Sequence, residues 1–407
     1  MAREQILGLD VGSNTIKASV AEGSKAHKIN LLTAVVAPSR GLRRGVVVDM
    51  EEAASAVNAV LQDIKQASKS AVKNIYLNVG GADIRTQISR GVVAVSRASA
   101  EIYKDDVDRV VQASEAVNLP PNRTILHTIT REYIVDGVGD IQEPLGMVGT
   151  RLEVNSFVID GFQPAVKNLV KCVELAGGSV SGIIFSPLAS ALAVLTRNQK
   201  ELGTVLIDIG YGTTGMAVYE ENKLLQTKVL PVGAGHVTMD LAVALKIPVE
   251  VAEKVKVSYG YAVSKEVSNK ESINLKKIDV NTQGAPSRRF VAEVIESRLS
   301  EICELVNNEL RLLGKASKLP AGAVLVGGGA KMPGIVDLVK SELKLSTQVG
   351  LPSPAQFEAV IPETIEFLES PEYVTNLGLI LWSEVLSPRR VLIGDNRLIG
   401  FLKNLLP

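Results

Sequence analysis

The fold follows from one stretch near the N-terminus, Ile6-Leu7-Gly8-Leu9-Asp10-Val11-Gly12-Ser13-Asn14-Thr15-Ile16-Lys17. An apolar strand ends in one acid, a turn of small residues follows, and a second strand leaves the turn. The pattern returns at Val205-Leu206-Ile207-Asp208-Ile209-Gly210-Tyr211-Gly212-Thr213-Thr214-Gly215, where Asp208 takes the place of Asp10. The repetition predicts a chain built in two halves around a shared ligand.

Both turns have the composition of a phosphate-binding loop. Glycines let backbone N–H groups approach an anion without a Cβ in the way, and neighbouring hydroxyls and amides add donors. Asp10 and Asp208 stand at strand ends, where a carboxylate can hold Mg²⁺, usually through water, against nucleotide phosphates. The alternative for one turn alone is an acid that only accepts bonds from turn amides. The predicted phosphate contacts are Gly12, Ser13, Asn14, Lys17, Gly210, Gly212, Thr213 and Thr214, with a third glycine turn at Gly327, Gly328 and Gly329.

Residues 210–215 also fit the Gly-x-Gly-x-x-Gly dinucleotide fingerprint. That motif must open a helix, whereas residues 216–219, Met-Ala-Val-Tyr, continue as a strand. The sequence has no P-loop, no Gly-x-Ser-x-Gly elbow and no His-Glu-x-x-His, and its histidines, His27, His127 and His236, lack ligand spacing. A β-hairpin that folds over phosphates is the better interpretation.

Length and charge set limits on the class of protein. The chain has 407 residues, which indicates two or more domains, and its 44 basic and 44 acidic side chains create no overall attraction to nucleic acid. Cys172 and Cys303 suggest neither a disulfide framework nor a zinc site. No secretory signal and no run of about 18 apolar residues is present, so we expect a cytoplasmic protein.

Strands that alternate with helices predict an α/β architecture. Apolar spacing predicts helices over 50–67, 164–176, 249–259 and 290–313, and a strand over 323–326 ends at the third glycine turn. Between residues 82 and 160 the sequence pattern changes and predicts short valine-rich strands around one helix. We interpret that region as an inserted subdomain.

Together these motifs carry a family resemblance. The hairpins at Asp10 and Asp208, the segment 187–190 and the turn 327–329 resemble the phosphate, connect and adenosine motifs of the actin, Hsp70 and sugar kinase superfamily. Within it, nearly the whole chain is similar to the FtsA family of bacterial cell-division proteins, through the stretches 39–45, 131–137, 144–147, 231–233, 252–256 and 373–379.

The resemblance implies an actin-like two-domain ATPase fold, a duplicated RNase H-like core with ATP and Mg²⁺ in the interdomain cleft. Domain 1 would comprise 1–81, 161–200 and the closing helix 371–386, with the family's own subdomain inserted at 82–160. Domain 2 would comprise 201–246 and 323–370, with an outer partner-docking subdomain at 247–322. A linker at 387–395 and an amphipathic membrane-targeting helix at 396–407 would follow.

The resemblance also extends the list of nucleotide contacts. Gly233 would belong to the ATP site, Glu253 and Lys256 would face the ribose, and Lys331 would lie near the adenine. Without the family, Glu253 and Lys256 are one helical turn apart and equally a surface ion pair.

Departures from the superfamily pattern predict slow hydrolysis. Tyr211 replaces a glycine of the second phosphate turn, and Gly215 stands where an acid is common. Ser186 occupies the position where active ATPases offer Gln or Glu to orient the attacking water. We therefore expect at most a slow ATPase.

The C-terminal segment has one apolar helical stripe with a basic flank. It is either a helix docked on its own core or an interfacial membrane helix, and its place after a linker favours the membrane. The predicted membrane contacts are Arg397, Leu398, Ile399, Phe401, Leu402, Lys403, Leu405 and Leu406.

By resemblance, the chain would be an ATP-binding division protein that polymerises on the cytoplasmic face of the membrane at the division site and anchors the FtsZ ring. Expected partners are the FtsZ C-terminal tail, further copies of this chain, membrane lipids and other divisome proteins, but no nucleic acid. Arg298, Asn307 and Arg311 are candidate exposed contacts for that tail. The alternatives are a phosphotransferase or exopolyphosphatase, and a pilus-assembly protein of the PilM type.

Overall fold

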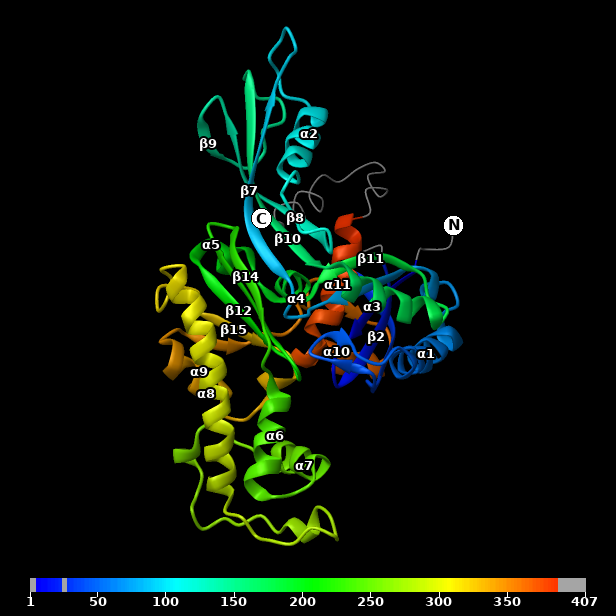
Figure 1. The fold of residues 1–407 in the computed structure, drawn as a ribbon, viewed down its shortest axis with the longest axis vertical. Helices are drawn as coiled ribbons and strands as arrows, with labels where there is room; N and C mark the ends of the chain where they lie inside the picture. Colours follow the sequence, from blue (N-terminus) through cyan, green and yellow to red (C-terminus); the bar gives the residue numbers. More distant parts are fainter. Residues whose placement is uncertain (1–4, 24–27, 387–407) are drawn as a thin grey trace.

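Two sheets of the same design form the centre of the molecule (Figure 1), which a computed structural model describes for residues 5–23 and 28–386. The predicted linker at 387–395 and terminal helix at 396–407 lie outside the described residues. The first sheet has the order β11-β6-β1-β2-β3-β17. Its strands are β1 (Gln5–Val11), β2 (Thr15–Gly23), β3 (Ile29–Pro38), β6 (Ile75–Val79), β11 (Val180–Phe185) and β17 (Phe357–Ala359).

The second sheet repeats the plan in the order β14-β13-β12-β15-β16. In both sheets, three strands that follow one another along the chain form an antiparallel meander. Two later strands then extend the sheet beyond the first strand of the meander, and both run parallel to it. This duplication is the structural counterpart of the repeated sequence motif. The strands are β12 (Thr204–Ile209), β13 (Thr214–Glu220), β14 (Lys223–Leu230), β15 (Ala323–Val326) and β16 (Thr347–Val349).

Helices cover both sheets. The first half of the molecule carries α1 (Met50–Ala67), α3 (Gln163–Leu175), α4 (Ser186–Val194), α10 (Ile365–Glu369) and α11 (Val374–Leu386), and the second half carries α5 (Arg197–Leu202), α6 (Ala234–Leu245), α7 (Val249–Tyr259), α8 (Arg288–Leu312) and α9 (Ile335–Leu343). The α1 helix begins where the Asp49 side chain accepts a hydrogen bond from the Glu52 amide. Its buried side chains are the predicted stripe Ala53, Val57, Val60, Leu61 and Ile64.

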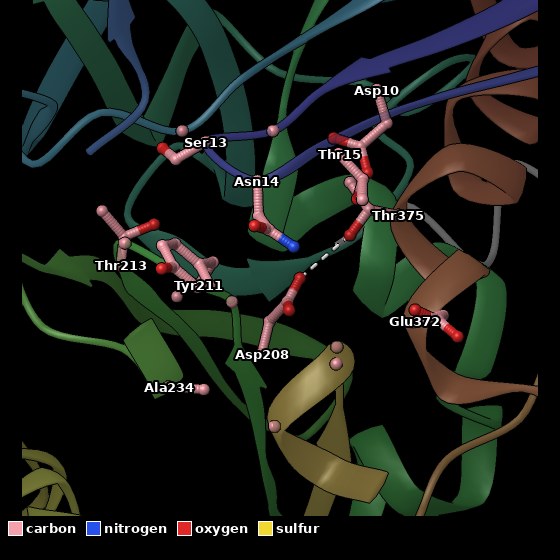
Figure 2. Close-up of a pocket in the computed structure, with 18 of the residues that line it drawn as sticks. Asp10, Ser13, Asn14, Thr15, Asp208, Tyr211, Thr213, Ala234, Glu372 and Thr375 are labelled. Atoms are coloured by element: carbon pink, nitrogen blue, oxygen red, sulfur yellow. Dashed lines mark hydrogen bonds between the residues drawn. The ribbon is translucent and has the colours of Figure 1, made fainter. Parts of the chain in front are cut away.

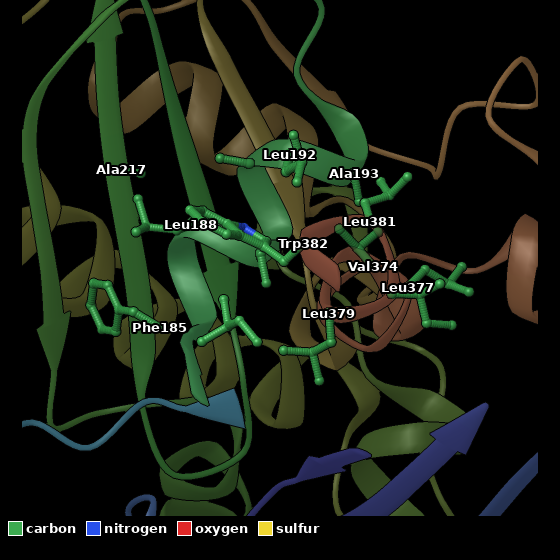
Figure 3. Close-up of a cluster of buried hydrophobic side chains, with 14 of the residues drawn as sticks. Phe185, Leu188, Leu192, Ala193, Ala217, Val374, Leu377, Leu379, Leu381 and Trp382 are labelled. Atoms are coloured by element: carbon green, nitrogen blue, oxygen red, sulfur yellow. The ribbon is translucent and has the colours of Figure 1, made fainter. Parts of the chain in front are cut away.

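The two halves share one apolar core. Figure 3 shows Leu188 of α4 and Trp382 of α11 packed with Ala217 of β13, so these two helices lie between the sheets. Because each half contributes side chains to the same cluster, the halves hold each other at a defined angle. That angle determines the shape of the cleft, which is lined in part by residues at the N-terminal ends of these two helices.

The inserted subdomain is a four-stranded sheet, β7-β10-β8-β9, with one helix packed on it. Figure 1 shows it at one end of the molecule, with α6, α7 and α8 at the other. His127 of β8 joins it to the first half, since its Nε2 accepts a hydrogen bond from the Phe185 amide at 3.0 Å. The elements are β7 (Arg85–Ala94), α2 (Lys104–Ser114), β8 (Arg123–Val135), β9 (Val138–Ile141) and β10 (Arg151–Phe162).

Some predicted boundaries were wrong. The sequence predicts that the helix after the third glycine turn begins at Pro333, but α9 begins at Ile335, because Gly334 has a φ of +79°, which is outside the right-handed helical region. Residues 371–373 form a 3₁₀ turn before α11. Val294 of α8 is half-buried and packs against the apolar core of the second half. No helix in the ranges 5–23 and 28–386 is both long and apolar enough to cross a membrane.

Candidate functional site

A cavity of about 420 Å³ lies between the two halves and is lined by both Asp-Gly hairpins. Figure 2 shows Ser13 and Asn14 from the first hairpin facing Asp208 and Tyr211 from the second. Most predicted phosphate and metal residues line it: Asp10, Gly12, Ser13, Asn14, Lys17, Asp208, Gly210, Gly212, Thr213, Gly327, Gly328 and Gly329. Segments about 200 residues apart in the sequence therefore form one site.

The two turns close in the same way. The Gly12 amide donates to the Thr15 carbonyl at 3.1 Å, and the Gly210 amide donates to the Thr213 carbonyl at 3.0 Å. A Cβ on Gly12 would lie 2.8 Å from that same Thr15 oxygen, so this position accepts only glycine without rearrangement. Equivalent turns with equivalent bonds present the same backbone groups to the cavity from both sides.

Asp10 is held at the end of β1 by a neighbouring strand. Its Oδ1 accepts a hydrogen bond from Asn78 Nδ2 at 2.7 Å, and Lys17 Nζ lies 3.8 Å from its Oδ2. Burial raises the pKa of the Asp10 carboxyl; the Lys17 charge opposes that effect and the Asp208 charge adds to it. A carboxylate buried near a second one in this way is stabilised by any cation that enters between them.

Asp208 is held by hydroxyl groups from the two helices between the sheets. Its Oδ2 accepts hydrogen bonds from Ser190 of α4 at 3.0 Å and from Thr375 of α11 at 2.9 Å, the second of which is dashed in Figure 2. The carboxylate can be reached from the cavity but is otherwise enclosed by protein, and this burial raises its pKa. Hydroxyl donors fix its orientation without neutralising its charge.

Glu253 and Lys256 of α7 form both the predicted ion pair and part of the cavity wall. Lys256 Nζ lies 2.7 Å from Glu253 Oε2 and also donates to Thr238 Oγ1 at 2.9 Å. Lys256 is only 7% exposed, so the pair is not a solvated surface contact. The two residues therefore form a largely buried ion pair at the cleft, and their contact with a ribose stays a prediction.

The third glycine turn connects the cavity to the start of α11. The Gly327 amide donates to the Pro371 carbonyl at 2.9 Å. Lys331 Nζ pairs with Glu372 Oε1 at 2.6 Å, and Lys17 Nζ donates to the Glu372 carbonyl at 2.8 Å. Elements from both halves thus converge on the segment that begins α11.

Two predicted contacts fall outside the cavity lining. The Thr214 hydroxyl donates to the Val232 carbonyl at 2.8 Å and is buried inside the second half. Gly233 packs against the second turn instead, since a Cβ there would lie 2.5 Å from the Gly210 carbonyl oxygen. Thr214 and Gly233 support the second turn on the side away from the cavity. The side chain of Thr214, the first residue of β13, points away from the cleft.

Comparisons with known proteins match this geometry to a family. The model of cell division protein FtsA matches residues 205–378, and that of the SHS2 domain inserted in FtsA matches residues 81–160. Cell division protein FtsA of Pseudomonas aeruginosa is 34% identical over 379 residues, which cover 93% of this chain and 89% of that protein. The chain belongs to the FtsA family. FtsA of Bacillus subtilis is 34% identical over 377 residues, 93% of this chain and 83% of that protein.

Solved structures confirm the actin-like α/β fold of this FtsA-family chain. The PilM-PilN type IV pilus biogenesis complex aligns with a TM-score of 0.65 at 19% identity, over 94% of this chain and 99% of that chain. MreB5 of Spiroplasma citri bound to ADP aligns with a TM-score of 0.52 at 16% identity, over 94% and 97%. The predicted fold is thereby confirmed, while the family matches confirm the family-specific insert and the role in cell division.

The candidate partner residues on α8 of this FtsA-family chain differ in accessibility. Arg311 is exposed and donates to Asn308 Oδ1 at 2.9 Å. Arg298 is half-buried, with Nε and Nη2 on the two oxygens of Asp240 at 2.6 and 2.9 Å. Asn307 is also half-buried. The expected exposure was wrong for Arg298 and Asn307; at Arg298 the reason is that α8 packs against α6, which carries Asp240.

Several cavity residues of the FtsA-family site were not found by sequence reasoning. They are Gly45, Asn78, Glu372 and Thr375. Asn78 carried a usable signal, because it is the one polar residue in the apolar strand β6, Ile-Tyr-Leu-Asn-Val. Thr375 carried none, since its role depends on how α11 packs against Asp208.

Proposed function

We propose that this FtsA-family protein holds ATP with Mg²⁺ in the cleft, polymerises on the cytoplasmic face of the membrane at the division site, and anchors the FtsZ ring there. The observation that carries the proposal is the pair of equivalent hairpins that face each other across one cavity, each with an acid at its strand end. Backbone amides and the Ser13 and Thr213 hydroxyls are suited to phosphate oxygens.

The residues present fit a magnesium ion bound together with a nucleotide. No group of three or more His, Cys, Asp or Glu side chains that could hold a metal occurs among the residues that the structure describes. Asp10 and Asp208 supply two carboxylates, and Mg²⁺ takes its remaining ligands from water and phosphate oxygens. When bound, the ion would neutralise phosphate charge. Asp10 and Asp208 would hold it directly or through water, and Lys17 would contact a phosphate oxygen.

The same cleft supports slow hydrolysis. Ser186 lines the cavity, but its hydroxyl donates to the Val79 carbonyl at 3.1 Å and its side chain is too short to orient a water at the terminal phosphate. Nucleotide then acts chiefly as a ligand that sets the angle between the halves and permits assembly. The MreB5 structures with ADP and AMPPNP are nucleotide-bound proteins of the same fold.

Membrane binding is assigned to the segment 396–407, which lies outside the described residues. Its six apolar side chains at ~1.5–3 kcal/mol each give on the order of 10 kcal/mol, reduced by partial burial and by about 1 kcal/mol or more per ordered residue. One tail binds weakly, and a filament that presents many tails binds firmly. Self-association therefore controls membrane residence.

FtsZ docking is assigned to the end of the molecule that holds α8. Arg311 is the exposed cation of the three candidates, whereas Arg298 is already paired with Asp240. An acidic or carboxylate-terminated tail would be attracted to the exposed residue.

Liposome co-sedimentation tests the function. The full chain and a chain that ends at residue 395 are spun with anionic vesicles, with and without Mg-ATP, in the presence of FtsZ. We expect the full chain with Mg-ATP to carry FtsZ into the pellet and the truncated chain to leave it in solution. Equal sedimentation of both chains would refute the assignment of the tail, and sedimentation of the full chain without FtsZ would refute the anchoring role.

A further inference from the structure

The turn between β4 (Leu42–Arg43) and β5 (Val46–Val47) lies across both phosphate hairpins. The Gly45 amide donates to Ser13 Oγ of the first hairpin at 3.0 Å. A Cβ built on Gly212 of the second hairpin would lie 3.2 Å from the Arg44 Cα. The backbone of Arg44 is therefore in contact distance of the point where the two hairpins meet.

Arg44 has an unusual backbone for its residue type. Its φ is +51°, in the left-handed region where side chains with a Cβ are disfavoured, and Gly45 after it has a φ of +76°. A glycine at position 44 would adopt this turn more easily. An arginine in a strained position beside a ligand cavity suggests that its side chain has a use there.

The guanidinium of Arg44 has no carboxylate within ion-pair distance in residues 5–23 and 28–386. Its Nη2 lies 3.4 Å from His236 Nε2, in an exposed contact between the two halves. His236 Nδ1 lies 3.1 Å from the Gly233 nitrogen and 3.3 Å from the Gly233 carbonyl oxygen, so it can accept from the amide or donate to the carbonyl. Whichever ring nitrogen carries the hydrogen, an imidazole supplies no negative charge to pair with the guanidinium of Arg44.

Other cations around the cavity are already engaged. Four carboxylates and three lysines line it. Lys256 pairs with Glu253, Lys331 pairs with Glu372, and Lys17 lies near Asp10 while it donates to the Glu372 carbonyl. Even with one Mg²⁺ bound, the side chains that line the cavity leave little uncompensated positive charge. A nucleoside triphosphate carries one more phosphate than a diphosphate, and that phosphate needs a further cation.

We propose that Arg44 turns from His236 into the cleft and contacts the terminal phosphate of the bound nucleotide, so that it determines the preference for triphosphate over diphosphate. A guanidinium presents parallel N–H donors that match two phosphate oxygens. A diphosphate would lack that phosphate and would leave Arg44 beside His236. This inference rests on the proposed nucleotide function of the cleft.

Calorimetric titration of the full chain with Mg-ADP and with a magnesium-bound, non-hydrolysable ATP analogue tests the assignment. The main variant is Arg44→Gly, which removes the cation and suits the left-handed backbone, so it does not strain the fold. Arg43→Ala is the matched control, because it removes the same charge one residue earlier on the same turn.

We expect Arg44→Gly to weaken binding of the triphosphate analogue by about 10- to 100-fold and to leave binding of Mg-ADP unchanged, whereas Arg43→Ala changes neither. The inference is overturned if the Arg44→Gly chain keeps the same ratio of affinities for the triphosphate analogue and Mg-ADP as the unmodified chain. It is also overturned if Arg43→Ala weakens triphosphate binding equally, because any nearby positive charge would then account for the effect. If the unmodified chain binds neither nucleotide, the proposed function fails instead.

Discussion

Replacing Asp208 with asparagine should raise the stability of the empty protein and abolish its response to nucleotide. Ser190 and Thr375 donate to Asp208 Oδ2, and the amide oxygen of an asparagine accepts the same two bonds. Only the buried charge is lost. A site designed for a cation is expected to cost stability when the cation is absent.

The substitution changes two quantities in opposite directions: it raises the Tm of the empty chain and removes the rise in Tm that Mg-ATP causes. Removing a buried charge should stabilise the empty chain on the order of 1 kcal/mol, which corresponds to a rise in Tm of roughly 2–4 °C for a domain of this size. Mg-ATP at 100 times its Kd stabilises the unmodified chain by about 2.7 kcal/mol, or roughly 5–10 °C. The variant should show the first shift and lose the second.

The pH dependence provides a further check of the sign. The folded-state pKa of Asp208 is raised above its usual 3.8 by burial, so the folded protein binds the proton more tightly than the unfolded chain. The contribution of Asp208 to the stability of the empty chain is therefore fully present below pH 3.8 and is lost as the pH rises through the raised pKa. The advantage of Asp208→Asn should be full above that range and disappear as the pH falls toward 4.

Thermal unfolding of the two chains, with and without Mg-ATP, measures both quantities. Asp49→Asn serves as the control, because Asp49 caps α1 on the surface and asparagine is an equally good cap. Asp49→Asn should follow the unmodified chain in every condition. A lower Tm for empty Asp208→Asn, or a full Mg-ATP shift in that variant, would refute the assignment of Asp208 to a cation site.

Other predictions concern packing and turnover. Gly235→Ala should lower Tm by several degrees, because its Cβ would lie 2.6 Å from the Tyr211 ring; Tyr211→Ala in the same chain should restore most of the loss, and additive losses would contradict the contact. Leu61→Ala, which empties a fully buried position of α1, should cost 2–5 kcal/mol in denaturant unfolding, and a cost near zero would contradict its place in the core. ATP turnover by the unmodified chain should fall well below the ~1–100 s⁻¹ of kinases; a rate in that range would contradict the interpretation of Ser186.

Elements with strong periodicity could be predicted from sequence to the residue. The helix over 50–67, the helix over 249–259 and the strand over 323–326 match α1, α7 and β15. In each, one apolar pattern agrees with the end signals around it. The short strands β9 and β16 and the helix α5 were not predicted, because a few polar residues carry too little pattern to distinguish them from loops.

The candidate site also contains residues that the sequence predicted and residues that it did not. Residues within the two hairpins were found because the glycines, the acid and the hydroxyls stand together in the chain. Asn78, Ser190 and Thr375 hold those acids from other elements. The pairing of β6 with β1 brings Asn78 to Asp10, and the packing of α4 and α11 between the sheets brings Ser190 and Thr375 to Asp208. Thr214 was misassigned for a related reason, since alternation along β13 turns its hydroxyl to Val232.

The central claim is that the two hairpins form one magnesium–nucleotide site. Equilibrium titration of Mg-ATP into the unmodified full chain, and into Asp10→Asn and Asp208→Asn, tests it most directly. We predict one ATP bound per chain, and loss of that binding in each variant, because either acid alone cannot hold the ion against the phosphates. Retained binding in both variants, or no binding by the unmodified chain in the presence of Mg²⁺, would contradict the account.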